Sequence, residues 1–292
     1  MIAIVGCGPA GISAALYTLR ANIEITIIGT RQTALALAEK IENYYGFAQP
    51  ISGKELFDIG IKQAKRFGCR VVAEEVVAIS SCDKGFKILT PNPSEEFEVS
   101  AVILATGKQR GKVDIKGLLE FEGRGISYCA ICDAFFFRGK KIAVIGDGAY
   151  AIAEANELLN VGCDVTILTN GSEPEVVSGS SIKLITKKIE IITGRERVER
   201  VIFEGGEEFE TEGIFVATGV ASSMDLARKL GVLTEGDRIV VNENGETNLP
   251  GVFAAGDCVN KLCQISLAVA SGTVAGLSAV KYVRALRGEL EK

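Results

Sequence analysis

The sequence predicts an α/β fold built from two units of the dinucleotide-binding, or Rossmann, type. The main observation is a repeat at an offset of 140 residues, in which residues 2–11 (IAIVGCGPAG) correspond to residues 142–151 (IAVIGDGAYA). Each copy continues through an Ala/Leu-rich helical stretch into a second β-branched run, at residues 25–28 and 165–168. This strand–turn–helix–strand pattern is typical of the start of a parallel sheet that binds a dinucleotide.

Further apolar strands complete the predicted sheets. Residues 101–107 (AVILATG) and 213–219 (GIFVATG) both end in Ala-Thr-Gly, and each comes after its own glycine turn. Residues 249–257 (LPGVFAAGD) form another strand that closes on an aspartate, and residues 265–286 are expected to form a long helix. The aspartate suits a ribityl or ribose hydroxyl, although an ordinary turn aspartate would occupy the same place.

The glycines of the first turn have distinct physical roles. Gly6 permits the tight turn out of the strand, Gly8 lets the backbone approach a pyrophosphate, and Gly11 lets the helix pack closely on the strand. The phosphates would then meet the N-terminus of the helix, where backbone N–H groups are unpaired. This position, directly after a strand and before a helix, favours a nucleotide site over a glycine turn without a ligand.

Composition excludes several classes of function. The chain has 292 residues, a net charge of −5 and no histidine. The length suits two domains or one large α/β domain, and the acidic balance argues against a nucleic-acid partner. The absence of histidine removes Ser-His-Asp and Cys-His catalysis. We expect no membrane partner, because the apolar runs look too short to span a bilayer and no secretory signal is visible. The expected location is the cytoplasm.

The eight cysteines include one Cys-x-x-Cys pair, Cys129 and Cys132, which is followed by Asp133. Such a pair is redox-active, half of a zinc site, or accidental. Zinc would need two more ligands, and Cys258 and Cys263, with four residues between them, are the other closely spaced pair. We therefore expect redox chemistry and no metal. Cys258 and Cys263 are expected to pack, with a second redox pair as the alternative, and Cys7 to be a buried filler.

Together these motifs resemble the two-domain flavoprotein disulfide reductases, and the CAICD segment is similar to that of the low-molecular-weight thioredoxin reductases. The resemblance covers residues 2 to about 286. It implies an FAD-binding domain at 1–112 and 242–292, split by an inserted pyridine-nucleotide-type domain at 113–241 that carries the redox-active pair. It also implies thioredoxin, or a similar protein disulfide, as the substrate and a homodimer as the assembly.

The resemblance also assigns the cofactor and its contacts. FAD is the implied cofactor, and the positions that match the family's contacts are Gly6, Gly8, Pro9, Ala10, Gly11, Asn43, Ala105, Thr106, Gly107, Gly256, Asp257 and Gln264. Two positions depart from the family pattern. Residues 32–35 read QTAL where the family has Gly-Gly-Gln-Leu, and Cys263 stands where an arginine is expected.

Within the redox motif, the resemblance implies that Cys132 faces the flavin and that Cys129 attacks the substrate disulfide. Asp133 is the family's acid, and the alternative for it is a helix N-cap. A small domain that serves both the flavin and a bulky protein partner must rotate. The expected hinges are residues 109–112 and 238–242.

The second glycine turn departs from an NADPH site. Asp147 places a carboxylate where a pyrophosphate would lie, and Tyr150 is bulky where the family has Ser or Thr. After the second strand, no Lys or Arg occurs before Lys183, so the cation cluster for a 2′-phosphate is missing. The inserted domain also carries an excess of seven negative charges. The alternative is that the surface charge of the inserted domain says nothing about nucleotide binding, because the pocket itself is locally neutral.

Some thioredoxin reductases similar to this chain take electrons from ferredoxin, and we expect ferredoxin as the donor. Ferredoxins are acidic, so basic docking patches are expected at Lys108, Arg110 and Lys112 or at Lys62, Lys65 and Arg66, although most charge runs are simply solvated. The alternatives are an NAD(P)H-dependent thioredoxin reductase and, in a different class, a non-catalytic flavin-binding redox sensor. The intact dithiol argues against the sensor.

Overall fold

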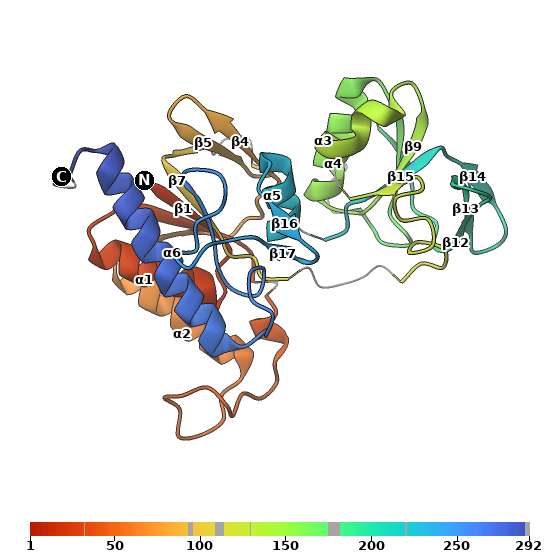
Figure 1. Ribbon diagram of the computed structural model, residues 1–292. Helices are drawn as coiled ribbons and strands as arrows, with labels where there is room; N and C mark the ends of the chain where they lie inside the picture. The colour runs from red at the N-terminus through yellow and green to blue at the C-terminus, as the bar shows by residue number, and fades with distance from the viewer. Residues whose placement is uncertain are drawn as a thin grey trace. The chain divides into compact units, whose positions relative to one another are not determined.

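The computed structural model describes residues 1–31, 33–92, 96–108, 114–128, 130–174, 182–219 and 221–289, without the side chains of residues 131 and 132. The chain forms two compact units (Figure 1). The first comprises Met1–Arg110 and Ser222–Lys292, and the second comprises Gly111–Ala221.

The first unit contains a five-stranded parallel sheet in the order β18-β7-β1-β2-β3. All residues of β1, β2, β7 and β18 are buried. Parallel strands covered on both faces need apolar side chains on both faces, which explains why these segments are nearly continuous apolar runs. The strands are β1 (Ile2–Val5), β2 (Ile25–Ile28), β3 (Arg70–Val72), β7 (Ala101–Leu104) and β18 (Val252–Ala254).

Three helices of this unit pack together: α1 (Pro9–Arg20), α2 (Gly53–Arg66) and α6 (Ile265–Leu286). The contact between α1 and α6 is close because α6 has glycine at the crossing. A Cβ on Gly272 would lie 2.1 Å from the carbonyl oxygen of Ala10. Larger residues there would force the two helices apart.

By length and composition alone, α6 has the character of a membrane span, with a mean hydropathy of 1.3 over an 18-residue window. This corrects the expectation that no apolar run is long enough. The core helix of a folded unit passes the same test, and α6 packs against α1, β7 and β18. Its length is therefore explained by burial within the first unit.

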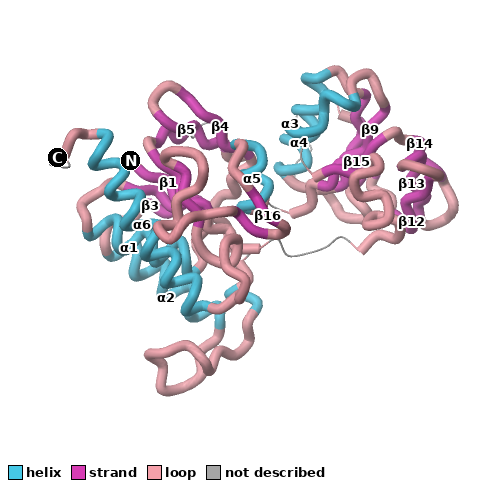
Figure 2. Tube along the Cα trace, in the orientation of Figure 1, coloured by secondary structure: helices cyan, strands magenta, loops and turns pink. Residues whose placement is uncertain are grey.

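Smaller elements complete the first unit. An antiparallel sheet is formed by β4 (Ala78–Cys82), β5 (Gly85–Leu89) and β6 (Phe97–Val99), and a 3₁₀ turn, η1, spans Leu35–Leu37. Helix α5 (Ser223–Leu230) starts with a capping box between Ser222 and Asp225 and is followed by the hairpin β16 (Thr234–Glu235) and β17 (Arg238–Ile239). Figure 2 shows these elements along the trace.

The second unit repeats the plan of the first. Its parallel sheet has the order β11-β10-β9-β15-β8, with helix α4 (Ala149–Val161) after the glycine turn. The strands are β8 (Ile126–Ser127), β9 (Lys141–Ile145), β10 (Asp164–Leu168), β11 (Lys183–Ile185) and β15 (Gly213–Val216). An antiparallel sheet adds β12 (Ile189–Gly194), β13 (Val198–Phe203) and β14 (Glu208–Glu210), and the redox segment contains the short helices α3 (Ala130–Asp133) and η2 (Ala134–Phe137).

The internal repeat is visible in the strand register. Ile2 pairs with Ile25 in the first sheet, and Ile142 pairs with Val165 in the second, which preserves the offset of 140 residues. Strand orders β3-β2-β1-β7 and β11-β10-β9-β15 correspond one to one. The predicted α/β fold class with two Rossmann-like units is confirmed.

The second boundary between the units differs from the predicted one. The units divide at 221/222, about twenty residues before the expected 241/242. Helix α5 belongs to the first unit because Ser223 is hydrogen-bonded to Thr106, and hairpin β16–β17 belongs there because the Ile239 amide donates to the Cys258 carbonyl at 2.8 Å. Residues 238–242 therefore lie inside the first unit and are not at a boundary. The first expected hinge, residues 109–112, lies outside the described residues.

Candidate active site

The first glycine turn leaves space for a ligand at one glycine and packs tightly at the other two. Gly6 has a φ of +112°, and a Cβ there would lie 2.4 Å from the carbonyl oxygen of Ala105. A Cβ on Gly11 would lie 1.9 Å from the carbonyl oxygen of Gly6, whereas a Cβ on Gly8 would meet nothing within 4 Å. Gly6 and Gly11 thus build the turn, and Gly8 opens it to a bulky group.

Helix α1 begins at this turn without a side-chain cap. Gly8 is the N-cap residue and Pro9 occupies the first helical turn. The backbone N–H groups at such a helix start lack partners within the helix, and they suit a pyrophosphate. The space at Gly8 and the uncapped start of α1 would suit the diphosphate of FAD, which the sequence analysis expects at Gly6 to Gly11.

The predicted contacts from other parts of the chain meet at this turn. Ala105 follows β7 and lies against Gly6, while Gly256 follows β18 and a Cβ there would lie 3.0 Å from the Cβ of Ala10. The Gly256 amide donates to the Ser271 hydroxyl on α6 at 2.9 Å, which fixes the loop that carries the half-buried Asp257. The carboxyl ends of parallel strands meet at one edge, so this convergence follows from the topology.

Two predicted flavin contacts that are 221 residues apart are hydrogen-bonded to each other. The Nδ2 of Asn43 donates to the Oε1 of Gln264 at 3.3 Å. Gln264 is the N-cap residue of α6, and Asn43 lies in the exposed loop before α2. The pair brings two amide side chains to the start of a long helix, a suitable place for the polar atoms of a flavin ring.

Thr106 is anchored by a residue that the sequence did not single out. Its backbone amide and its hydroxyl lie 3.0 Å and 2.8 Å from the hydroxyl of Ser223. Ser223 is fully buried at the start of α5. Nothing in the sequence marked this serine, because the contact joins two segments 117 residues apart.

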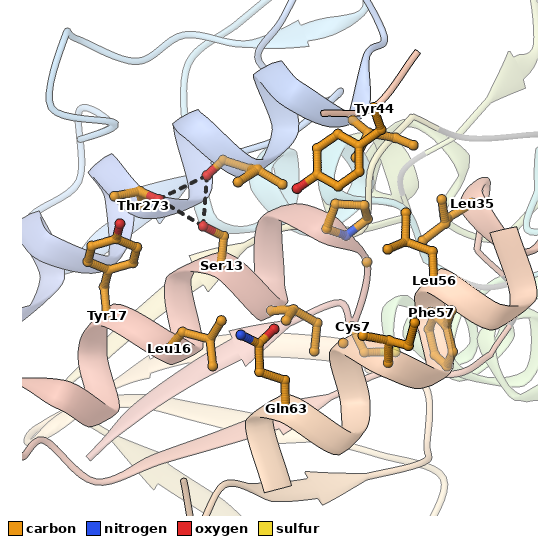
Figure 3. Close-up of a pocket in the computed structure, with 17 residues that line it drawn as sticks. Cys7, Ser13, Leu16, Tyr17, Leu35, Tyr44, Leu56, Phe57, Gln63 and Thr273 are labelled. Atoms are coloured by element: carbon orange, nitrogen blue, oxygen red, sulfur yellow. Dashed lines mark hydrogen bonds between the residues drawn. The ribbon is translucent and has the colours of Figure 1, made fainter. Parts of the chain in front are cut away.

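A cavity of about 270 Å³ extends from the glycine turn along α1, between α2 and α6 (Figure 3). Its wall is mostly apolar and includes Leu16, Tyr44 and Phe57, and a hydrogen bond of 2.8 Å joins Ser13 to Thr273 at one side. Gly8 and Pro9 are the predicted cofactor residues that line it. The cavity therefore adjoins the pyrophosphate end of the site and is not the flavin site as a whole.

The cysteines of the first unit are free thiols, and most of them are buried. Burial raises the pKa of Cys7 to about 11 and the pKa of Cys258 to about 12. Cys258 is fully buried, whereas Cys263 is exposed. Burial agrees with packing as the role of Cys7 and Cys258. The expectation that Cys263 packs in the interior is wrong, because Cys263 is exposed.

The redox motif lies in the second unit, on α3. Cys129 is outside the described residues, and so is the side chain of Cys132. The neighbouring Asp133 is half-buried, and its Oδ2 accepts a hydrogen bond of 2.6 Å from the hydroxyl of Ser127, at the end of β8. Asp133 is the N-cap residue of η2, but its side chain makes no cap hydrogen bond. Its carboxylate is thus held by Ser127 rather than by the helix it precedes.

A second carboxylate contacts the redox motif. Glu154 on α4 has 1% of its surface exposed, and its Oε2 accepts a hydrogen bond of 2.7 Å from the backbone amide of Ala130. The sequence analysis overlooked this residue. A signal was present, because Glu154 lies at helical spacing among the apolar residues Tyr150, Ala151, Ala155 and Leu158, which form the buried face of α4.

The second glycine turn keeps its backbone plan but differs in its side chains. A Cβ on Gly146 would lie 2.2 Å from the carbonyl oxygen of Ala217, which repeats the contact of Gly6 with Ala105. Tyr150, in the first turn of α4, is 1% exposed. After β10, the Oδ1 of Asn170 accepts a hydrogen bond of 2.8 Å from the Ile189 amide, so the loop start is held by a neighbouring strand.

The second unit keeps its excess of negative charge when it is counted with the observed boundary. Residues 111–221 carry 12 Lys and Arg against 18 Asp and Glu. Of the two expected basic patches, Lys108 is paired with Asp237 at 2.7 Å, while Arg110 and Lys112 lie outside the described residues. Lys62, Lys65 and Arg66 are exposed on α2 and form no ion pair with any residue that the structure describes.

Comparisons with known proteins agree with this architecture. The sequence profile of the pyridine nucleotide-disulphide oxidoreductase family matches residues 1–272. A thioredoxin reductase from Aquifex aeolicus (strain VF5) is 37% identical over 301 residues, which cover 97% of this chain and 93% of that protein.

Two solved structures extend the likeness to three dimensions. The atypical thioredoxin reductase TRi from Desulfovibrio vulgaris Hildenborough is 37% identical with a TM-score of 0.89, and the match covers 97% of this chain and 98% of that one. A ferredoxin-flavin thioredoxin reductase from Clostridium acetobutylicum is 32% identical with a TM-score of 0.71, over 97% and 98% of the two chains.

The predicted resemblance to the thioredoxin reductases and the predicted FAD cofactor are thereby confirmed. The matching family and the thioredoxin reductases within it are FAD flavoproteins, and the turn at Gly8 has the space that the diphosphate of FAD requires. The chain belongs to the pyridine nucleotide-disulphide oxidoreductase family, as a thioredoxin reductase-like FAD flavoprotein.

Proposed function

We propose that the chain takes electrons from reduced ferredoxin, passes them through FAD to the Cys129–Cys132 disulfide, and reduces thioredoxin or a thioredoxin-like protein. The observation that carries the choice of donor is the second glycine turn. Asp147 adds a negative charge within this turn, and the first turn of the following helix α4 contains the buried Tyr150. No Lys or Arg follows β10 before Lys183. The ferredoxin-flavin thioredoxin reductase among the relatives supports the same donor.

FAD supplies a ring that takes up and releases electrons when it is bound. The chain's own residues hold the cofactor. Gly8 leaves room for the diphosphate, and the start of α1 provides N–H donors. Asn43 and Gln264, already joined to each other, provide amide groups at the start of α6.

The dithiol step balances two electrons and two protons. The thiolate of Cys129 attacks one sulfur of the substrate disulfide and forms a mixed disulfide, while the other substrate sulfur leaves as a thiolate. The thiolate of Cys132 then attacks the sulfur of Cys129, closes the Cys129–Cys132 disulfide and releases the second substrate thiolate. Asp133, held by Ser127, serves as the acid that protonates a departing sulfur.

Exposed aromatic side chains beside the motif support a protein as the substrate. Phe135 and Phe136 directly follow Ala134 on η2, and they are 75% and 70% exposed. Their rings lie edge to face, with centroids 6.3 Å apart. Adjacent aromatic side chains that face solvent are typical of the buried centre of a protein–protein contact.

The electron donor is tested by anaerobic titration of the purified yellow protein with reduced ferredoxin, NADPH and NADH, followed by flavin bleaching. We expect reduced ferredoxin to bleach the flavin and both nucleotides to act poorly. Two electrons are needed per disulfide, so a ferredoxin with one single-electron cluster must react twice. Rapid bleaching by micromolar NADPH would contradict the proposal.

One observation favours NAD(P)H as a second candidate donor. Helix α4 starts at Gly148 without a side-chain cap, so the second turn keeps the backbone plan of a phosphate site. The same titration decides between the donors. A flavin-binding redox sensor without turnover is the remaining alternative, and steady-state reduction of thioredoxin with an artificial reductant would contradict it.

We also propose a cytoplasmic homodimer in which the redox unit moves between the flavin and its protein substrate. The unit boundary at 221/222 moves the second expected hinge to that position. Light scattering coupled to size exclusion tests the dimer. Small-angle scattering of the oxidised, reduced and thioredoxin-bound forms tests the movement, and one unchanged curve would contradict it.

A further inference from the structure

The carboxylate of Glu154 is buried against the redox motif and has no role in the dithiol steps above. Glu154 is 1% exposed, on the second turn of α4. A buried carboxylate is costly unless it is paired or hydrogen-bonded. Its hydrogen bond to the Ala130 amide, at 2.7 Å, is therefore a strong local constraint.

The position of this bond ties Glu154 to the dithiol. Ala130 directly follows Cys129, and it is fully buried at the start of α3. Helices α3 and α4 pack against each other and lie side by side in both views (Figures 1 and 2). The carboxylate of Glu154, on the buried face of α4, thus lies in a low-dielectric setting and accepts a hydrogen bond from the residue that directly follows Cys129.

We propose that Glu154 is a positioning residue for the redox motif, and that its charge shifts the Cys129–Cys132 equilibrium toward the disulfide. This proposal rests on the proposed role of the two cysteines. A negative charge close to a dithiol opposes the formation of a second negative charge on sulfur. The Ala130 amide, occupied by Glu154, is also unavailable as a donor to a thiolate. Both effects make the dithiol a stronger reductant of its substrate.

Other charged groups on the elements around α4 are accounted for. On α3, Asp133 is bound to Ser127, and η2 contributes no charged side chain. On β9, Lys141 lies over the ring of Phe209, and on β10, Asp164 is exposed and pairs with Lys183. Glu154 is the charged residue that α4 buries among the described residues.

The test compares three variants of the FAD-loaded protein. Glu154→Gln keeps the shape and an oxygen acceptor but removes the charge, Glu154→Asp keeps the charge, and Glu157→Gln removes an exposed charge one turn away. Each protein is equilibrated anaerobically in dithiothreitol redox buffers and alkylated, and peptide mass spectrometry gives the dithiol-to-disulfide ratio at Cys129 and Cys132. The rate of alkylation at pH 7 is measured in parallel.

We expect Glu154→Gln to raise the dithiol-to-disulfide ratio about tenfold, which corresponds to about 30 mV, and to speed alkylation. Glu154→Asp should stay within about twofold of the wild type, and Glu157→Gln should match it. If Glu154→Gln matches Glu157→Gln, or if Glu154→Asp shifts the ratio as far, the charge has no such role and the proposal is wrong.

A substitute variant and the behaviour of the wild type keep the result decisive. If Glu154→Gln does not fold, Glu154→Met, which is of similar length and uncharged, takes its place with the same expected shift. If the wild-type pair shows no exchange between dithiol and disulfide, the proposed function itself is wrong. If the wild type exchanges normally and the uncharged variants do not shift it, only the role of Glu154 is wrong.

Discussion

The hydroxyl of Thr106 lies 2.8 Å from the hydroxyl of Ser223, although the two residues are 117 positions apart. Thr106 belongs to the loop after β7 that is expected to contact FAD, and Ser223 is the first residue of α5, directly after the unit boundary. The hydroxyl of Ser223 also accepts the Thr106 amide at 3.0 Å. The segment that returns from the second unit is therefore hydrogen-bonded to the edge of the first unit at which FAD is expected to bind.

We expect Ser223→Ala to destabilise the first unit and to weaken FAD retention together. The variant leaves the part-buried amide of Thr106 without this acceptor, and the loss of such a hydrogen bond costs about 0.5–1.5 kcal/mol. Thermal unfolding and the FAD-to-protein ratio after dialysis measure the two effects. Ser81→Ala, at an exposed strand position, is the matched control and should change neither. Full FAD retention in Ser223→Ala would show that this hydrogen bond does not affect the cofactor.

Gly8→Val should give a folded but colourless protein. Gly8 has a φ of −75°, and a Cβ there meets nothing within 4 Å, so the chain itself accepts a side chain. The same side chain would occupy the space that the diphosphate needs. The absorbance at 450 nm measures bound flavin, and circular dichroism confirms the fold. Gly8→Ala should lose less flavin than Gly8→Val, and normal flavin content in Gly8→Val would contradict the assignment.

The sequence predicted those parts of the fold and site that depend on local patterns. The glycine turns at Gly6 and Gly146 were predictable because each needs a backbone that approaches a strand end too closely for a side chain. The parallel pairing of β1 with β2 and of β9 with β10 followed from the repeat, since each repeat is a β–α–β unit, whereas the order of the other strands was not predicted.

Contacts between distant segments were not predictable in this way. The Asn43–Gln264 hydrogen bond joins residues 221 positions apart. The capping box of Ser222 and Asp225 marks the start of a helix, but it does not indicate that the chain returns to the first unit there. The role of Glu154 was only partly predictable from the sequence. Its place on the apolar stripe of α4 was readable, but its partner is a backbone amide, which carries no sequence signal.

The dithiol variants should separate flavin binding from turnover. Cys129→Ser and Cys132→Ser each remove one sulfur of the exchange described above, and the cofactor is expected to bind the other unit. We therefore expect normal FAD content and normal photochemical reduction of the flavin, with thioredoxin reduction lowered to background. Cys263→Ser, which changes an exposed cysteine outside the pair, serves as the control. Substantial turnover in Cys129→Ser would contradict the dithiol mechanism.

Stability should fall as the pH rises above about 9, partly because of buried thiols. The ordinary pKa of a cysteine is 9.0, and burial raises that of Cys258 to about 12. Between these values the unfolded thiol loses its proton while the folded thiol keeps it, so the unfolded state gains. The effect is at most about 1.4 kcal/mol per pH unit for each such thiol.

Urea unfolding at pH 8 and at pH 10.5 tests this linkage. The loss of unfolding free energy between the two pH values should be smaller in Cys258→Ala than in the wild type, even though the variant is less stable at pH 8. Lys and Tyr also titrate in this range, and the difference between the two proteins isolates the thiol. Equal losses would show that Cys258 does not contribute.

Ferredoxin-driven turnover should depend on the basic end of α2. Lys62, Lys65 and Arg66 are exposed there, whereas Lys108 is already paired with Asp237. An acidic partner is attracted to unpaired cations, and salt screens that attraction over about 10 Å at 0.1 M. If ferredoxin is the donor, we therefore expect it to dock on α2 rather than on the segment that begins at Lys108.

Replacing Lys62, Lys65 and Arg66 together by Glu should slow ferredoxin-driven thioredoxin reduction at least about tenfold at low salt, and raised salt should shrink the difference from the wild type. Photochemical flavin reduction should not change, because it needs no docking. Lys84→Glu, at an exposed turn of the same unit, is the control for a charge reversal away from α2. If the triple variant keeps wild-type turnover and salt dependence, ferredoxin does not dock on α2. The surface around Lys108 would then be tested next, with Asp237→Lys, because this change removes the carboxylate that pairs with Lys108.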